Sequence, residues 1–202
     1  SLVSQGLASD LFTATTQVQT ALGIPSTINP LTFDPLASLS SSTDSTANKQ
    51  AALAFLSVQQ QVATVIAQAS TSISKGATAT DASNASQAVV TALAMHFKFG
   101  YRNYFWTYSA YFTYDTNNAS NSNNTYDANN NTTTTPVATF DLKNTTSIQN
   151  AVTKAAEINK TTLTTESLNS IAKVVSQSNT LLNTASQGAT IAESLTAMSK
   201  TA

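Results

Sequence analysis

The sequence contains no cysteine and few charged residues, and these two scarcities limit what the protein can do. Without cysteine it has no disulfide bonds, thiolate metal sites or cysteine nucleophiles, and the absence is compatible with secretion by a bacterium. Charged residues make up 9% of the 202 positions, and the formal net charge is −1. Because no cluster of lysine or arginine is present to neutralise phosphates, we expect no nucleic-acid binding.

Long apolar runs and catalytic motifs are also missing. No run approaches the roughly 20 apolar residues that a transmembrane helix requires, so we expect no membrane span. His96 is the only histidine, and no nucleophile-elbow glycine pattern, phosphate-binding loop or zinc-ligand spacing accompanies it. We therefore expect no enzymatic activity, no cofactor and no metal site, and a structural or surface role for His96.

Acidic residues offer two weaker candidates for chemistry. Asp115 and Asp127 flank an asparagine-rich tract whose oxygen atoms suit a calcium ion. Because acidic ligands at a fixed spacing are missing, a solvated loop is the better interpretation. Asp34 lies between Phe33 and Pro35, where an Asx turn that starts a helix is favoured over a catalytic carboxylate.

Apolar residues recur at steps of three and four along most of the chain, the spacing that places them on one face of a helix. The first such segment spans about 4–22 and stops at Gly23, and the prolines at positions 25, 30 and 35 forbid its continuation. A stripe through Phe55 and Ile73 predicts a second helix of about 30 residues that ends near Gly76. Side chains that can cap the later helices are Asp44 or Ser45, Asp81, Asn144 or Thr145, and Thr164.

These patterns predict a mainly α-helical single domain, residues 1–202. We expect an antiparallel bundle of about five helices, with a period that continues past Gly188 into a final apolar stretch. A long insertion at 97–139 interrupts the helical pattern. It consists of an aromatic segment, 97–114, and an Asn/Thr-rich loop, 115–135, and forms an arm that is either a β-hairpin or irregular.

The aromatic segment holds ten of the 15 aromatic residues of the chain. Its spacing fits both a helical stripe and a strand alternation, so both conformations remain open. Tyrosine and tryptophan suit protein interfaces and the stacking of sugar rings. A subunit or partner interface is the favoured role, with local core or hairpin packing and carbohydrate contact as alternatives. The candidate binding residues are Tyr101, Tyr104, Phe105, Trp106, Tyr108, Tyr111 and Phe112.

The Asn/Thr-rich loop cannot bury enough apolar surface to fold alone, so we expect it to be a flexible solvent loop. The alternative is an ordered surface, because asparagine and threonine side chains form ladders when identical copies stack in a filament.

Two stretches of the sequence resemble the helical modules of large secreted bacterial surface proteins described as adhesins, which often carry cadherin-like or calcium-binding repeats. The first is LGIPSTINPLTFDPLASL, residues 22–39, followed by the helix AALAFLSVQQQVATVIAQAS; the weaker second is FDLKNTTSIQNAV, residues 140–152. The residues that carry the first match are Leu22, Gly23, Pro25, Thr32, Phe33, Asp34, Pro35 and Leu36.

The resemblance implies an extracellular or cell-surface location and a non-enzymatic role, and it supplies no catalytic residues. The chain departs from the family pattern at 97–139, where the resemblance predicts a brief connection between helices. The leading hypothesis is a structural or adhesive module that self-associates through the arm into a surface filament or matrix. Its partners are other copies of itself, surface proteins or polysaccharide. The alternative is a carbohydrate-binding module that uses Trp106 and nearby tyrosines.

Overall fold

The computed structural model describes residues 2–4, 6–74, 78–99, 124–126, 132–134, 140–188 and 190–201. Within them the chain is mainly helical, which confirms the predicted helical bundle. The helices are α1 (Leu11–Leu22), α2 (Pro35–Ser40), α3 (Thr46–Ser74), α4 (Ala79–Phe99), α6 (Thr145–Ile158), α7 (Thr165–Ala185) and α8 (Ile191–Thr201). Two short strands, β1 (Asn124–Tyr126) and β2 (Thr132–Thr134), pair antiparallel with Thr125 opposite Thr133.

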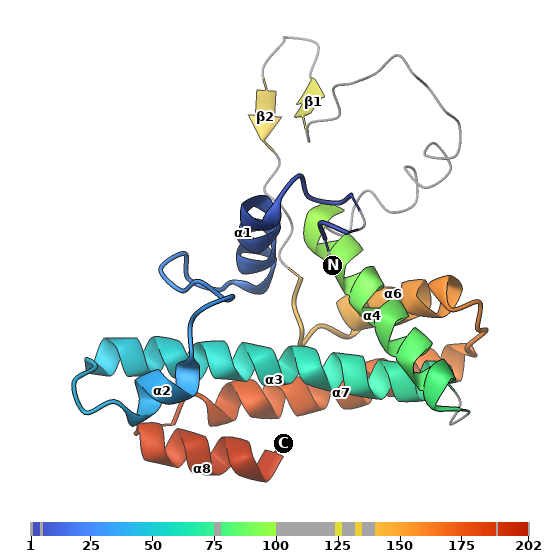
Figure 1. Ribbon diagram of the computed structural model, residues 1–202. Coiled ribbons are helices and arrows are strands. Elements are labelled where there is room, and N and C mark those ends of the chain that lie inside the picture. The colour runs from blue at the N-terminus through green and yellow to red at the C-terminus, as the bar shows by residue number, and fades with distance from the viewer. Residues whose placement is uncertain are drawn as a thin grey trace.

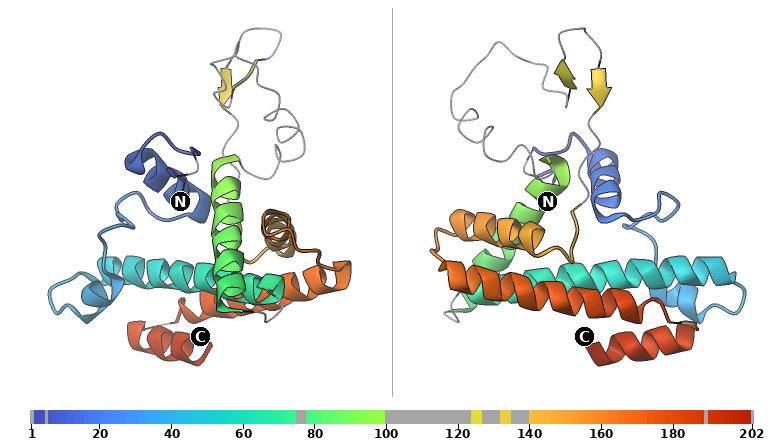
Figure 2. Two further views of the ribbon diagram at one scale, coloured as in Figure 1. Left: turned by 45° about the vertical axis from the view of Figure 1, so that its right-hand side comes forward. Right: turned by 180° about the vertical axis from the view of Figure 1, so that it is seen from behind.

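The long helices α3 and α7 lie side by side along most of their length and run in opposite directions (Figure 1). Helix α4 rises steeply from the end of α3, and α6 packs against both α4 and α7 (Figure 2). Helix α8 lies against α7 and α3 at one side of the bundle, whereas α1 lies beside the end of α4 at the other. The bundle is therefore built on one antiparallel helix pair, with the other helices packed around it.

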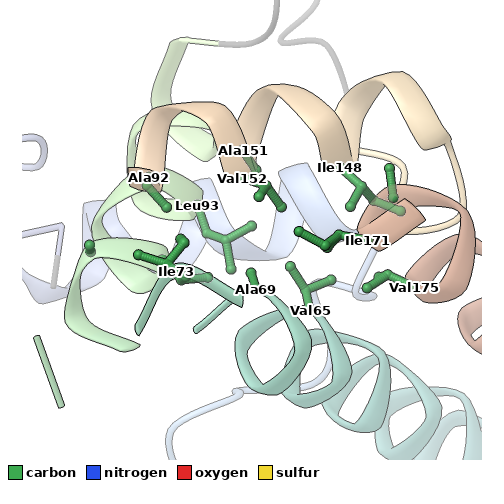
Figure 3. Packing of buried hydrophobic residues seen from close by; sticks show 14 of the residues in the cluster. Val65, Ala69, Ile73, Ala92, Leu93, Ile148, Ala151, Val152, Ile171 and Val175 are labelled. Carbon is green, nitrogen blue, oxygen red and sulfur yellow. The ribbon is translucent and has the colours of Figure 1, made fainter. Parts of the chain in front are cut away.

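The main core lies where α3, α4, α6 and α7 meet (Figure 3). Val65, Ala69 and Ile73 form one stripe of α3 and point toward Leu93 of α4 and Ile148 of α6. Most of the remaining core side chains are alanine or valine, so the helices approach each other closely. Burial of many small apolar side chains supplies the main stabilising term, because each contributes in proportion to the area it removes from water.

The segment between α1 and α2 belongs to a second, smaller core. Gly23 ends α1 in the left-handed conformation (φ 65°), which costs a glycine little. The chain then buries Ile24 and Ile28 against Phe55 of α3, and the Phe33 ring meets Phe55 edge-on at a centroid distance of 5.8 Å. The proline-rich motif at 22–39 therefore folds as a connection anchored on α3.

Most predicted helix caps are confirmed. Asp34 accepts hydrogen bonds from the Leu36 and Ala37 amides at the start of α2, as expected of an Asx turn. The other confirmed caps join a side-chain oxygen to an amide three residues later, which satisfies a donor that the first turn leaves unpaired. They are Ser45 with Asn48, Asn144 with Ser147, and Thr164 with Ser167. Gly76 lies outside the described residues.

Two predicted helix starts are wrong. Helix α1 begins at Leu11 and not near Ser4, because Gly6 is left-handed (φ 67°) and folds the preceding residues into a turn, while Asp10 caps the helix through the Thr13 amide. Helix α4 begins at Ala79, before the predicted cap Asp81. Thr78 caps the helix by accepting from the Asp81 amide, and the Asp81 carboxylate accepts from the Thr78 amide in return.

The expected number of about five helices is too small for the described part of the chain, which has seven. The short α2 was expected only as a helix start at Asp34, and its apolar pattern is too brief to show a period, so it was not counted among the five. Helix α8 is separate from α7, because the helix ends at Ala185 and Thr190 starts a new one through a reciprocal pair of hydrogen bonds with Glu193.

We predict that Ile148→Ala lowers the free energy of unfolding by about 2–5 kcal/mol, since it removes a fully buried side chain and leaves a cavity. Leu181→Ala is the matched control, because Leu181 is 58% exposed on α7 and its truncation should cost within about 0.5 kcal/mol. Urea unfolding of both variants measures the difference. Equal losses would show that α6 is not part of the cooperative core.

Candidate functional site

The seven predicted binding residues lie outside the described residues: Tyr101, Tyr104, Phe105, Trp106, Tyr108, Tyr111 and Phe112. What the structure does describe is the place where this segment leaves the bundle and the place where the chain returns. The insertion was predicted to begin at Phe97, and this start is wrong. Residues 97–99 are the last turn of α4, and Phe97 is buried in the main core. The insertion therefore begins after Phe99.

Both ends of the insertion meet in a cluster of three rings, His96, Phe97 and Phe140, which we call the aromatic junction. The Phe140 ring packs edge-to-face on Phe97 at a centroid distance of 5.8 Å and on His96 at 5.6 Å. Such T-shaped pairs are favourable beyond the area they bury. The Phe140 amide also donates to the Ala21 carbonyl at the end of α1, at 2.9 Å. The chain thus re-enters the bundle beside the point at which it left.

Helix α7 also holds residues 140–144, the segment through which the chain returns to the bundle. Asn179, which is fully buried, donates through Nδ2 to the Leu142 carbonyl at 2.7 Å, and the Ser176 hydroxyl donates to the Lys143 carbonyl. Buried backbone carbonyls need such partners, because an unpaired one costs about as much as a lost hydrogen bond. The route from Phe140 to the α6 cap at Asn144 is therefore determined by the bundle itself.

His96 is buried, with 3% of its surface exposed, and its Nδ1 atom lies 2.8 Å from the Ala92 carbonyl. Since a carbonyl only accepts, Nδ1 carries the proton of this hydrogen bond. Burial lowers the pKa of His96 below its ordinary value of 6.5; the Ala92 contact opposes this and the nearby Lys154 ammonium adds to it. His96 is therefore a neutral core residue at pH 7. Among the described residues, no group of three or more metal-ligating side chains comes together.

A surface cleft of about 340 Å³ lies between α1 and the last turn of α4. We call it the α1–α4 cleft. Phe97 of the aromatic junction forms part of its wall, and so does Phe12, a residue that is 82% exposed. The Gln17 side-chain oxygen, Oε1, is buried beside it and accepts no hydrogen bond. The lining residues are Phe12, Thr13, Thr16, Gln17, Thr20, Phe97 and Lys98.

This cleft was not predicted from the sequence. Its one visible signal was Phe12, a large apolar residue that lies off the stripe formed by Leu7, Ala14 and Val18. Spacing along the sequence did not show which helix would flank Phe12, because α1 ends at Leu22 and α4 begins only at Ala79.

None of the described helices is both long and apolar enough to cross a membrane. No protein-family model matches the chain, and comparisons with curated proteins and with solved structures likewise gave no match.

We predict that the protein loses stability as the pH falls below about 6.5 and that His96 contributes to the loss. The unfolded chain protonates this histidine at its ordinary pKa, whereas the folded chain resists protonation, so acid favours unfolding. One such group changes the free energy of unfolding by at most about 1.4 kcal/mol per pH unit.

Urea unfolding between pH 7.5 and 5.0 measures this slope, and this range lies above the pKa of the exposed caps Asp10 and Asp81, which their hydrogen bonds lower. His96→Gln should give a flatter profile than the parent. Parallel profiles would contradict the assignment of the acid sensitivity to His96.

Proposed function

We propose that this protein is a non-enzymatic extracellular structural or adhesive module that associates with other copies of itself through its aromatic segment, residues 101–114. The observation that carries the proposal is the aromatic junction. Phe97 and Phe140, which flank the insertion, both belong to the main core, and the helices on either side pack directly on each other. The bundle can therefore hold residues 100–139 as an addition whose ends are fixed.

The composition of the inserted residues supports a contact role. Residues 101–114 contain six of the seven tyrosines and tryptophans in the chain. These side chains combine a large apolar area with a hydrogen-bonding group, and interfaces are enriched in them. The helices form their described core almost entirely from aliphatic side chains, with Phe55, Phe97 and Phe140 as the large rings among the buried residues.

Low charge favours association of identical copies. Charged residues are 9% of the chain and the net charge is −1, so little electrostatic repulsion keeps two copies apart. The Asn/Thr-rich tract at 115–135 supplies amides and hydroxyls that can hydrogen-bond around an aromatic contact, or ladder between stacked copies. A filament or a matrix at the cell surface is the assembly that these properties favour.

The cell-surface location rests on the resemblance of residues 22–39 and 140–152 to helical modules of bacterial adhesins. In the fold these two stretches are the connection anchored on α3 and the return segment with the start of α6. Both are structural parts of the bundle. The resemblance therefore concerns the helical scaffold, and the inserted segment is what would distinguish this protein from such modules.

Deletion of residues 100–139 tests whether the insertion is an addition to the bundle. We expect a variant that joins Phe99 to Phe140 through a short Gly-Ser linker to remain helical and to unfold cooperatively, because the rings on both sides of the linker are already in contact. Circular dichroism during thermal unfolding measures this. An unfolded or molten product would place the insertion in the core and contradict the proposal.

Removal of the aromatic rings tests the contact itself. We expect the triple variant Tyr104→Ser, Trp106→Ser and Tyr108→Ser to lose self-association while its helical content stays unchanged. Leu31→Ser with Leu36→Ser is the control. These two leucines are 57% and 61% exposed, so replacing them also reduces the apolar surface. Sedimentation velocity over a concentration series measures assembly.

Three outcomes separate the hypotheses. Loss of assembly in the triple variant but not in the control supports the proposal. Equal loss in both indicates general surface stickiness and contradicts it. A parent that stays monomeric at every concentration also contradicts it; a glycan array that then shows binding lost in Trp106→Ala would select the carbohydrate-binding alternative.

A further inference from the structure

We propose that the α1–α4 cleft is the acceptor site for an aromatic side chain from the segment 101–114 of a second copy of this chain. This inference rests on the proposed function, and it adds the surface on which the aromatic segment of the neighbour docks. The segment supplies the guest, and the cleft between Phe12 and Phe97 receives it.

The shape of the cleft suits a flat apolar guest. Its volume of about 340 Å³ lies at the lower end of the range for ligand sites, roughly 300–1,000 Å³. Phe12 and Phe97 form its aromatic walls, and the threonines of α1 add methyl groups. Phe12 is 82% exposed, the largest exposure among the large apolar residues that the structure describes. A docked ring would cover it and pair with it in an offset or edge-to-face geometry.

The polar groups around the cleft favour a ring that carries a hydrogen-bond donor. Gln17 Oε1 is buried without a partner, and a buried acceptor left unpaired costs free energy. A tyrosine hydroxyl or an indole N–H can satisfy it when the amide turns toward the guest. Lys98 lines the same cleft, and an ammonium group is attracted to the electron-rich face of a tyrosine or tryptophan ring.

The chain itself contains the guest that this chemistry requires. Tyrosine and tryptophan are nearly confined to residues 101–114, within the 24 positions that separate Phe99 from β1. No acidic residue lines the cleft, so a cationic ligand is not favoured there.

A second copy is the better donor than the same chain. Lys98, one residue before the end of α4, is itself part of the cleft wall. Tyr101 and Tyr104 follow Lys98 by only three and six residues, so the chain would have to reverse at once for either of these two side chains to enter the cleft of its own copy. A neighbouring copy approaches from solvent without this constraint. Because donor and acceptor surfaces differ, each copy offers both, and a head-to-tail contact gives an open chain when the rotation between copies does not close a ring.

The cysteine-free sequence allows a direct test by disulfide trapping. Thr16→Cys places a thiol in the cleft, on an exposed position of α1, and Tyr104→Cys places one in the donor segment. When the two single variants are mixed under mild oxidation, a mixed dimer can form only between different molecules. Gln177→Cys, on the exposed face of α7, replaces Thr16→Cys in the control mixture.

We expect the mixed dimer of Thr16→Cys with Tyr104→Cys to form about tenfold faster than the control dimer, as it should when docking raises the effective concentration of the two thiols. Adding Phe12→Ala to the Thr16→Cys protein should reduce this rate to the control level. Equal rates in both mixtures overturn the proposal. A double variant that forms only an internal disulfide, while the mixture forms none, also overturns it by assigning the cleft to the same chain.

Phe12→Ala alone separates this inference from the proposed function. Phe12 is exposed, so the fold should tolerate its truncation, and assembly should require about tenfold more protein if it is an aromatic anchor. Assembly that depends on Tyr104, Trp106 and Tyr108 but not on Phe12 leaves the proposed function in place and removes the cleft as its acceptor. Assembly that depends on none of them removes both.

Discussion

The contact on which the rest of the described structure depends is the packing of Phe140 on His96 and Phe97. It joins the last turn of α4 to the segment that leads into α6, across 42 intervening residues, and the Phe140 amide ties the same point to α1. Closing so long a loop costs conformational entropy, and the ring contacts at its two ends help to offset that cost when α6 packs on α4. Rings buried at both ends determine where the loop closes.

This arrangement separates two tasks along one chain. Aliphatic side chains of α3, α4, α6 and α7 stabilise the bundle, and their small size lets the helices approach closely. Buried polar groups such as Asn179 hold the return segment in place through hydrogen bonds. We propose that the aromatic residues at 101–114 supply a contact that the bundle does not require. We propose that a contact of this kind from a neighbouring copy forms at the α1–α4 cleft, beside the aromatic junction.

Local rules predicted much of the fold. Periodicity identified α3, α6 and α7, and side-chain chemistry identified the caps Asp34, Asn144 and Thr164, because both signals act over three or four residues. The two helix starts were predicted wrongly because a neighbouring residue determines where each helix begins. Gly6 interrupts the apolar pattern that suggested a longer α1, and Thr78 forms a reciprocal cap with Asp81. Only one part of the candidate site could be predicted from the sequence, because composition distinguishes the aromatic segment. The cleft forms only where α1 and α4 are in contact, and no local sequence pattern predicts that contact.

Electron microscopy of the purified intact protein measures most directly whether this chain assembles with itself. We expect regular filaments or rings in which one copy follows another in a single direction, because the donor segment and the acceptor cleft are different surfaces. Closed dimers with twofold symmetry would contradict the head-to-tail contact. Monodisperse monomers at high concentration would contradict self-association itself.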